Sequence, residues 1–383
     1  MKPLDRSLVI ALVCTTLLKL YLALAPEGSL DTAGFLDHLH KIRALGVDAY
    51  HVRGVFDNPF NSPPAMIHVI RFWGWLADTS GIPFRFWLRL PSVLSDVGSF
   101  LLVARWLTKL WPNKNHVGVL MCLVLCPTAI LISGYHGNTD SVMIFLILLS
   151  IYLVETTWIA GLLFGLALCV KAVPLAFVPA IFLYLPTWRK RFIFFGIAIL
   201  IFVICSLPYL AQDPKAILST VFGYSSIYGK WGWTQLAVII FPDPTYLHGR
   251  FDVQGPHATF ARILKLVTMV LIVGVSVWLN RAKSKPSLFI QCGLMTTILL
   301  FMAPGFGPQY LVWLVPFVVA LGLRTTLLYY VTSGFLVIGQ YACEAFASCF
   351  PLVLRLLIGF LCWLSLVAMI LAYRRALKGS LRS

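Results

Sequence analysis

The sequence predicts an all-α polytopic membrane protein, with about 12 transmembrane helices and with interfacial helices in its first outer loop. Of the 383 residues, 60% are hydrophobic and 11% are charged, whereas a soluble domain carries about 25% charged residues. The mean hydropathy is +0.88. A chain this apolar does not remain disordered in water. Nine cysteines in 383 residues are also too sparse for a small disulfide scaffold.

Apolar stretches that can span a bilayer recur along the whole chain, because a helix of about 20 residues crosses the hydrocarbon core. The stretch 158–185 contains Lys171, Pro174 and Pro179, so we interpret it as two spans with a break at the membrane face. Residues 1–383 are therefore treated as a single integral membrane domain. The candidate spans lie near residues 8–24, 87–104, 117–134, 141–155, 158–171, 173–185, 192–208, 261–279, 287–303, 309–323, 326–342 and 352–373.

The distribution of Lys and Arg predicts the orientation of these spans. With the N-terminus in the cytoplasm, the cytoplasmic segments contain 16 basic and two acidic residues, whereas the outer segment 25–86 contains five basic and six acidic residues. This pattern follows the positive-inside rule and places the C-terminus in the cytoplasm as well. The net charge of +16 then mainly sets topology, so nucleic acid is not an expected partner. Lys19, near the outer end of the first span, is expected to extend to the lipid headgroups.

Two long outer segments, 25–86 and 209–260, stand out because the other connections are short. In the first, apolar residues recur at spacings of three and four, which predicts an amphipathic helix over 32–45 with Asp31 at its N-terminus. The turn-rich stretch FDNPFNSPP ends this helix, and residues 65–77 predict a second one. Both helices are expected to lie in the membrane interface and to form a roof over an outer cavity.

Polar residues also gather in GYHGNTDS, residues 134–141, between the third and fourth spans. The glycines, Thr139 and Asp140 suit the caps of the two flanking helices. Capping alone does not require His136 and Asn138 as well, so we expect this segment both to cap the helices and to line a site.

Charged residues lie within or at the ends of several predicted spans. Arg89 and Asp96 are seven residues apart, so they share one helix face and suit a buried network. Lys171 is expected at the outer end of its span, where it suits either a lipid phosphate or a phosphorylated ligand beside a cavity.

Six features follow one another in an order that resembles the GT-C glycosyltransferases, in particular bacterial mannosyltransferase-like members, over roughly residues 1–320. They are Asp31 with an aromatic residue four positions on, a turn ending in Pro63-Pro64, RLPSVLSD (89–96), HGNTD (136–140), GLLFGLALCVKAVPLAFVPA (161–180) and GFGPQYLVWLVPF (305–317). The resemblance implies a GT-C-like fold. It also implies transfer of a sugar, with a hexose such as mannose as first choice, from a polyprenyl-phosphate donor to a glycan or lipid-linked acceptor on the extracytoplasmic face.

The resemblance also implies roles for individual residues. Asp31 matches the catalytic base, and Lys171 and Arg89 are the candidates that bind the donor phosphate. Phe35 stands where family members often have Tyr, and Gln309 stands where eukaryotic relatives have a His that contacts the donor. The residues expected to bind substrate are Asp57, which is also a rival base, and Asn58, Asn61, His136, Asn138, Asp140, Gln309 and Tyr310.

The chemistry of the expected inverting transfer explains these residue types. A carboxylate accepts the proton of the attacking hydroxyl, and cations stabilise the departing phosphate. One carboxylate suffices because the leaving group is already a phosphate, in contrast with the carboxylate pair of glycosidases. No cofactor is required, and a divalent metal stays a minor alternative. A transporter or flippase of a lipid-linked or small polar substrate is the alternative from another class. The short connections favour the bacterial plasma membrane over the endoplasmic reticulum.

Overall fold

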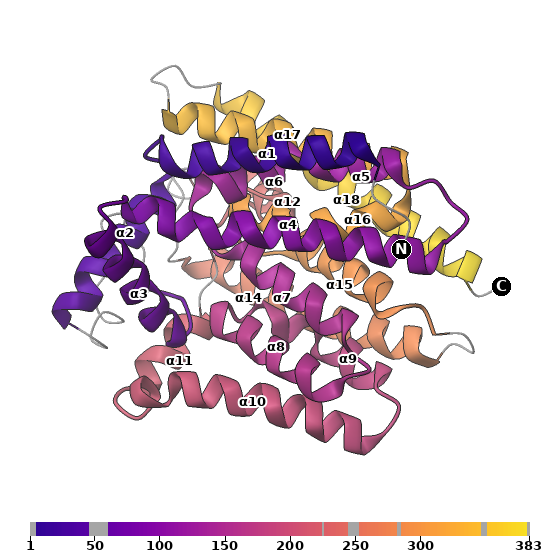
Figure 1. Ribbon diagram of the computed structural model, residues 1–383, viewed down its shortest axis with the longest axis horizontal. Helices are drawn as coiled ribbons and strands as arrows, with labels where there is room; N and C mark the ends of the chain where they lie inside the picture. Colours follow the sequence, from indigo (N-terminus) through magenta and orange to yellow (C-terminus); the bar gives the residue numbers. More distant parts are fainter. Residues whose placement is uncertain are drawn as a thin grey trace. The chain divides into compact units, whose positions relative to one another are not determined.

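The structure is a computed structural model and is all-helical in the residues that it describes, namely 5–45, 60–223, 226–243, 253–281, 285–345 and 351–380 (Figure 1). Within these ranges, β-type pairing is limited to one antiparallel bridge between Ile227 and Phe306. The chain divides into two compact units. The first contains residues 1–125, 129–175 and 187–224, and the second contains residues 126–128, 176–186 and 225–383.

The first unit is a row of long helices with shorter helices at one end. The helices α1, α4, α7, α8 and α10 pack against one another in that order, and α2, α3 and α11 lie together at one end of the row (Figure 1). The elements are α1 (Arg6–Leu24), α2 (Leu30–Leu45), α3 (Ala65–Ser80), α4 (Phe84–Leu110), α5 (Val117–Val124), η2 (Ile132–His136), α7 (Asp140–Tyr152), α8 (Thr157–Val170), α10 (Trp188–Leu210) and α11 (Pro214–Gly223).

The second unit contains most of the C-terminal half of the chain. In it, α14 packs on α9 and α15, and α17 packs on α18. The elements are α9 (Val178–Tyr184), α12 (Gly232–Ile240), α14 (Gly255–Arg281), α15 (Leu288–Met302), η4 (Pro308–Trp313), α16 (Val315–Val318), η5 (Val319–Leu321), α17 (Leu323–Ala345) and α18 (Leu352–Ser380). Two of the unit boundaries fall within α6 (Pro127–Leu131) and η3 (Val173–Phe177).

The helices confirm an integral multi-pass membrane protein. Each of the 12 predicted spans coincides with a helical stretch, and six of these helices are long and apolar enough to cross a bilayer by themselves. Five further stretches are shorter apolar helices, such as α7 and α15, and α17 belongs to neither group. Within the described residues, the helices of full spanning length and composition are therefore fewer than the 12 expected. The predicted break in 158–185 is also present, because α8 ends at Val170 and Lys171 has an extended backbone before η3 begins.

The two predicted amphipathic helices are α2 and α3, and their apolar faces are buried in protein. Phe35, Leu39 and Ile42 of α2 join Ile67 and Ile70 of α3 in one core cluster. This cluster also contains Ile217 and Val221 of α11. Helices from the two predicted outer segments therefore meet at one end of the first unit.

Candidate active site

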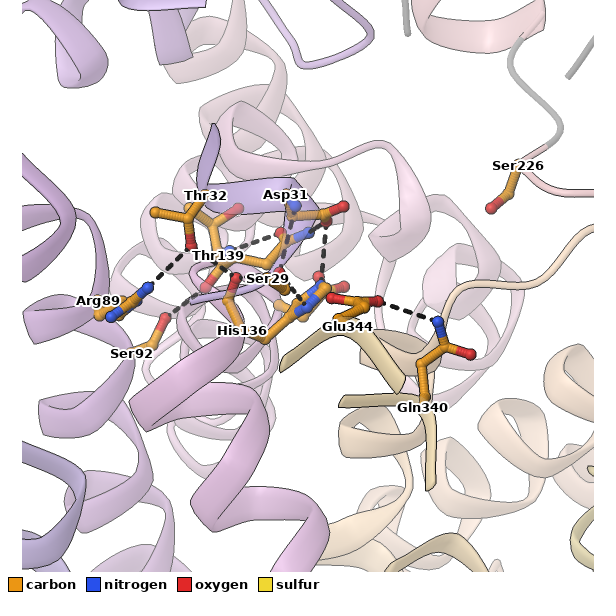
Figure 2. Close-up of polar contacts among 12 residues, drawn as sticks. Ser29, Asp31, Thr32, Arg89, Ser92, His136, Thr139, Ser226, Gln340 and Glu344 are labelled. Carbon is orange, nitrogen blue, oxygen red and sulfur yellow. Dashed lines mark hydrogen bonds and ion pairs between the residues drawn. The ribbon is translucent and has the colours of Figure 1, made fainter. Parts of the chain in front are cut away.

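The candidate site is built around Asp31, in the first turn of α2. Its backbone N–H donates to the hydroxyl of Ser29, 3.2 Å away, so Ser29 satisfies one of the free N–H groups at the start of the helix. The Asp31 side chain is 31% exposed. Its Oδ2 atom accepts a hydrogen bond from Asn138 Nδ2 at 2.8 Å and lies 3.0 Å from His136 Nε2 (Figure 2). The carboxylate is thus anchored through one oxygen.

His136 and Asn138 reach Asp31 because the HGNTD segment turns sharply between two helices. The π-helical turn η2 ends at His136, and Gly137 follows with a left-handed φ of 78°. A Cβ atom at Gly137 would lie 2.3 Å from the hydroxyl oxygen of Thr32, so both the backbone and the space require glycine here. The prediction that this segment caps its flanking helices is confirmed at Gly137, which ends η2. At the other end, Thr139 occupies the N-terminal cap position of α7, but its side chain makes no capping hydrogen bond.

Hydrogen bonds hold both ends of this segment in place. Ser133 donates to Asp96 Oδ2 at 2.6 Å and is bonded to Ser141 at 2.8 Å. Asp96 is also paired with Lys19, whose Nζ lies 2.6 Å from the same oxygen. Lys19 is only 7% exposed, so the expectation that it extends to the headgroups is wrong. Buried charges are stable when they are paired, and the partner of Asp96 is Lys19.

The His136 backbone and ring are held by α2. Its carbonyl accepts from the hydroxyls of Ser29 at 2.6 Å and Thr32 at 3.0 Å. Its Nδ1 atom lies 2.8 Å from the Ser29 hydroxyl oxygen. The carbonyl of Asn138 accepts from Ser92 of α4 at 2.6 Å. Two parts of the chain that are distant in sequence, the start of α2 and the helix α4, therefore fix the two residues that contact Asp31.

Asp140 and Lys171 form an ion pair in the same unit. Asp140 lies in the first turn of α7, where a carboxylate is favoured by the helix dipole. Its Oδ2 lies 2.6 Å from Lys171 Nζ, and the Asp140 side chain is fully buried while that of Lys171 is 20% exposed. Asp140 therefore orients a cation that still reaches solvent.

Arg89, the second candidate for the donor phosphate, has a different set of partners. It is fully buried, and its guanidinium donates to the carbonyls of Leu22, Ala23, Pro26 and Glu27 and to the Thr32 hydroxyl, at 2.6–3.2 Å. Four of these acceptors are backbone carbonyls at and after the end of α1, where carbonyls lack helical partners. Arg89 thus joins α1 to α2, and we do not retain it as a phosphate ligand.

Opposing effects set the ionisation of Asp31. Burial raises the pKa of this carboxyl, but the positive charges of His136 and Lys171 and the hydrogen bonds from His136 and Asn138 lower it more. The net pKa lies below the ordinary value for Asp, so Asp31 is a carboxylate near neutral pH. Burial also lowers the pKa of the nearby His38 to about 4, which leaves that ring neutral.

Five further residues were expected to bind substrate, namely Asp57, Asn58, Asn61, Gln309 and Tyr310. Asp57 and Asn58 lie outside the described residues. Asn61 is half-buried and follows Phe60, which packs on His38 of α2 at 5.2 Å between ring centroids. Gln309 and Tyr310 lie in η4 of the second unit. Within the described ranges, no group of three His, Cys, Asp or Glu residues is placed to hold a metal ion.

Four small hydroxyl residues that support the site, Ser29, Thr32, Ser92 and Ser133, were not among the predicted site residues. Ser29 stands just before the amphipathic helix, where a helix-capping serine is expected, and this signal could have identified it. Thr32, Ser92 and Ser133 contact residues 104, 46 and 37 positions away, and no local pattern predicts such partners.

A match to a protein-family model supports the glycosyltransferase resemblance. A search of curated protein sequences found no match. Among solved structures, ArnT from Cupriavidus metallidurans, crystallised with undecaprenyl phosphate, is similar with a TM-score of 0.49 and 13% identity, over 98% of this chain and 76% of that chain. Residues 60–304 match the model for glycosyltransferase family 87, a stretch that begins after Asp31 and includes His136 and Lys171. Because the match covers more than half of the chain, the protein belongs to glycosyltransferase family 87.

Proposed function

We propose that this glycosyltransferase moves a hexose, with mannose as first choice, from a polyprenyl-phosphate donor to a hydroxyl group of a glycan or lipid-linked acceptor. The transfer takes place on the extracytoplasmic face and inverts the anomeric centre. Family membership supports an enzyme over the transporter or flippase that the sequence left open. Beyond family membership, we propose the class of donor, the class of acceptor and the roles of individual residues.

The observation that carries the proposal is the one-sided anchoring of Asp31. Its Oδ2 contacts His136 and Asn138, while Oδ1 has no hydrogen-bond partner among the described residues. A general base needs an oxygen that is free to accept a proton from its substrate, on a side chain whose orientation is fixed. Asp31 meets both conditions, and its low pKa keeps it ionised before the reaction.

In the proposed reaction, the acceptor hydroxyl attacks the anomeric carbon and its proton passes to Asp31 Oδ1. The bond between the anomeric carbon and the phosphate oxygen breaks, and its electron pair leaves with the polyprenyl phosphate. Lys171 supplies positive charge for this leaving group. Its effect on the Asp31 pKa indicates that its charge is felt at the base. Asp140, fully buried at 2.6 Å from Nζ, keeps the Lys171 side chain oriented.

The short connections support a membrane-embedded donor. On the predicted cytoplasmic side, six residues, 111–116, join α4 to α5, and three residues, 185–187, join α9 to α10. Such connections do not form a domain for a soluble nucleotide sugar. On the predicted outer side, Cys343 at the end of α17 is disulfide-bonded, as suits an oxidising compartment outside the cytoplasm.

The donor class can be tested with the full-length protein in lipid nanodiscs. The assay supplies mannose, glucose or arabinose as a polyprenyl phosphate or as a nucleotide sugar, together with a lipid extract as acceptor, and measures the released carrier. We expect release of polyprenyl phosphate from at least one lipid donor and a product of inverted anomeric configuration. Turnover of nucleotide sugars alone would contradict the proposed donor class, and a retained configuration would contradict the single-displacement mechanism.

A further inference from the structure

The hydrogen bonds of the Ser29 hydroxyl indicate which ring nitrogens of His136 carry a hydrogen, and hence what His136 does beside Asp31. The Ser29 hydroxyl has a single hydrogen, and it lies 2.6 Å from the His136 carbonyl oxygen, which can only accept. The hydroxyl therefore donates to this carbonyl. The same Ser29 oxygen lies 2.8 Å from His136 Nδ1, so this contact is a hydrogen bond only if Nδ1 carries a hydrogen and donates it.

When Nδ1 is protonated, the contact between Nε2 and Asp31 indicates whether Nε2 is protonated as well. Nε2 lies 3.0 Å from Asp31 Oδ2. If Nε2 had only a lone pair, it would face a carboxylate oxygen and repel it. The arrangement is attractive when Nε2 is protonated as well, because an imidazolium then faces a carboxylate. The side chain of His136 is 3% exposed, so little water screens this pair.

We propose that His136 is the positioning residue of the transferase base, and that its imidazolium holds Oδ2 of Asp31 so that Oδ1 receives the proton of the acceptor hydroxyl. This inference rests on the proposed function and deepens it. When the acceptor O–H bond breaks, the proton passes to Oδ1 while His136 retains both of its ring protons. After the sugar has been transferred, the proton leaves Oδ1 for water through the exposed side of Asp31.

The proposal predicts how activity depends on pH. An opposite charge at this distance lowers the pKa of a carboxyl by about one to three units. Removal of the imidazolium raises the pKa of Asp31, and because the base must be ionised, the acid limb of kcat/KM moves to higher pH. Among the described residues, Lys171, with its partner Asp140, also acts on Asp31, and the ion pair of Asp37 with Lys41 lies further along the same helix.

The test compares the pH profile of kcat/KM in wild type and His136→Gln, with polyprenyl-phosphate-mannose as the probe donor or whichever lipid donor turns over. We expect the variant to lose about 10- to 100-fold in kcat and its acid limb to move up by about one to three pH units. His38→Gln is the matched control, since His38 is also a buried histidine near Asp31 but is already neutral. We expect its acid limb to stay at the wild-type position.

A second variant covers the case in which His136→Gln does not fold. Ser29→Ala keeps the ring but removes the acceptor of the Nδ1 hydrogen, so we expect a shift in the same direction and of smaller size. The ionisation of Asp31 can also be measured without turnover, from the infrared band of its protonated carboxyl recorded across the pH range. The spectra of Asp31→Asn are subtracted, so that only the band of Asp31 remains.

The outcomes separate this inference from the proposed function. An acid limb and an infrared titration that coincide with wild type in both His136→Gln and Ser29→Ala would overturn the role of His136. If Asp31→Asn abolishes turnover in the same experiments, Asp31 still remains the base. Full turnover in Asp31→Asn would overturn both.

Discussion

Gly137 provides a sensitive test of the site geometry, because it forms the turn that brings His136 and Asn138 to Asp31. In Gly137→Ala, the new Cβ would lie 2.3 Å from the Thr32 hydroxyl oxygen. An ordinary contact of about 3.4 Å would require a displacement of about 1 Å. The Thr32 hydroxyl is not free to move, since it is bonded to the His136 carbonyl and to Arg89 at 3.0 Å each. A shift of about 1 Å at a catalytic group costs on the order of 100-fold in rate.

A matched control separates this displacement from the cost of the backbone conformation. Gly81 also has a left-handed φ, 68°, but a Cβ there meets no atom within 4 Å. Both Gly→Ala variants should lose about 1–2 kcal/mol of stability from the conformation alone, measured as a lower Tm in detergent. Only Gly137→Ala should also lose about 100-fold in kcat/KM. The reasoning is refuted if Gly137→Ala keeps wild-type kcat/KM with the same loss of Tm as Gly81→Ala.

Two further predictions concern Arg89 and Lys171, the two cations that the sequence suggested for the donor phosphate. Arg89→Lys should lower the free energy of unfolding by about 2–5 kcal/mol, because Lys cannot replace all of the hydrogen bonds to carbonyls at the end of α1. An unchanged Tm together with weaker donor binding would instead indicate that Arg89 is a phosphate ligand. Lys171→Gln should lower kcat by about 100- to 1000-fold and also destabilise the protein, since it removes the cation paired with the buried Asp140 carboxylate. The double variant with Asp140→Asn should recover the Tm but not kcat, and recovery of both would show that Lys171 has only a structural role.

The sequence predicts those parts of the structure that depend on local patterns. Hydropathy identifies the helices that cross the membrane, and the spacing of Phe35, Leu39 and Ile42 predicts α2, whose N-terminus carries Asp31. The cluster of polar residues in HGNTD likewise pointed to the segment that contacts Asp31. In each case the signal lies within one continuous stretch of the chain.

The remaining features depend on contacts between distant residues. Lys19 and Asp96 are 77 positions apart, and nothing near either residue indicates that the lysine is buried in an ion pair. Arg89 was assigned to a phosphate by its charge, but its partners are carbonyls that α1 exposes at its end. The packing of α1 against α4 decides which acceptor the guanidinium meets, and a sequence pattern does not contain that packing.

The assignment of Asp31 as the base is tested most directly by comparing the turnover of Asp31→Asn with that of Asp37→Asn. The second variant is the control, because it makes the same change on the same helix at a residue that is paired with Lys41. Release of polyprenyl phosphate and binding of the lipid donor are measured side by side, with the full-length protein in nanodiscs. We expect Asp31→Asn to bind the donor as wild type does but to lose about 100- to 10,000-fold in kcat, and Asp37→Asn to retain turnover. Wild-type turnover in Asp31→Asn, or an equal loss in both variants, would contradict the assignment of Asp31 as the base.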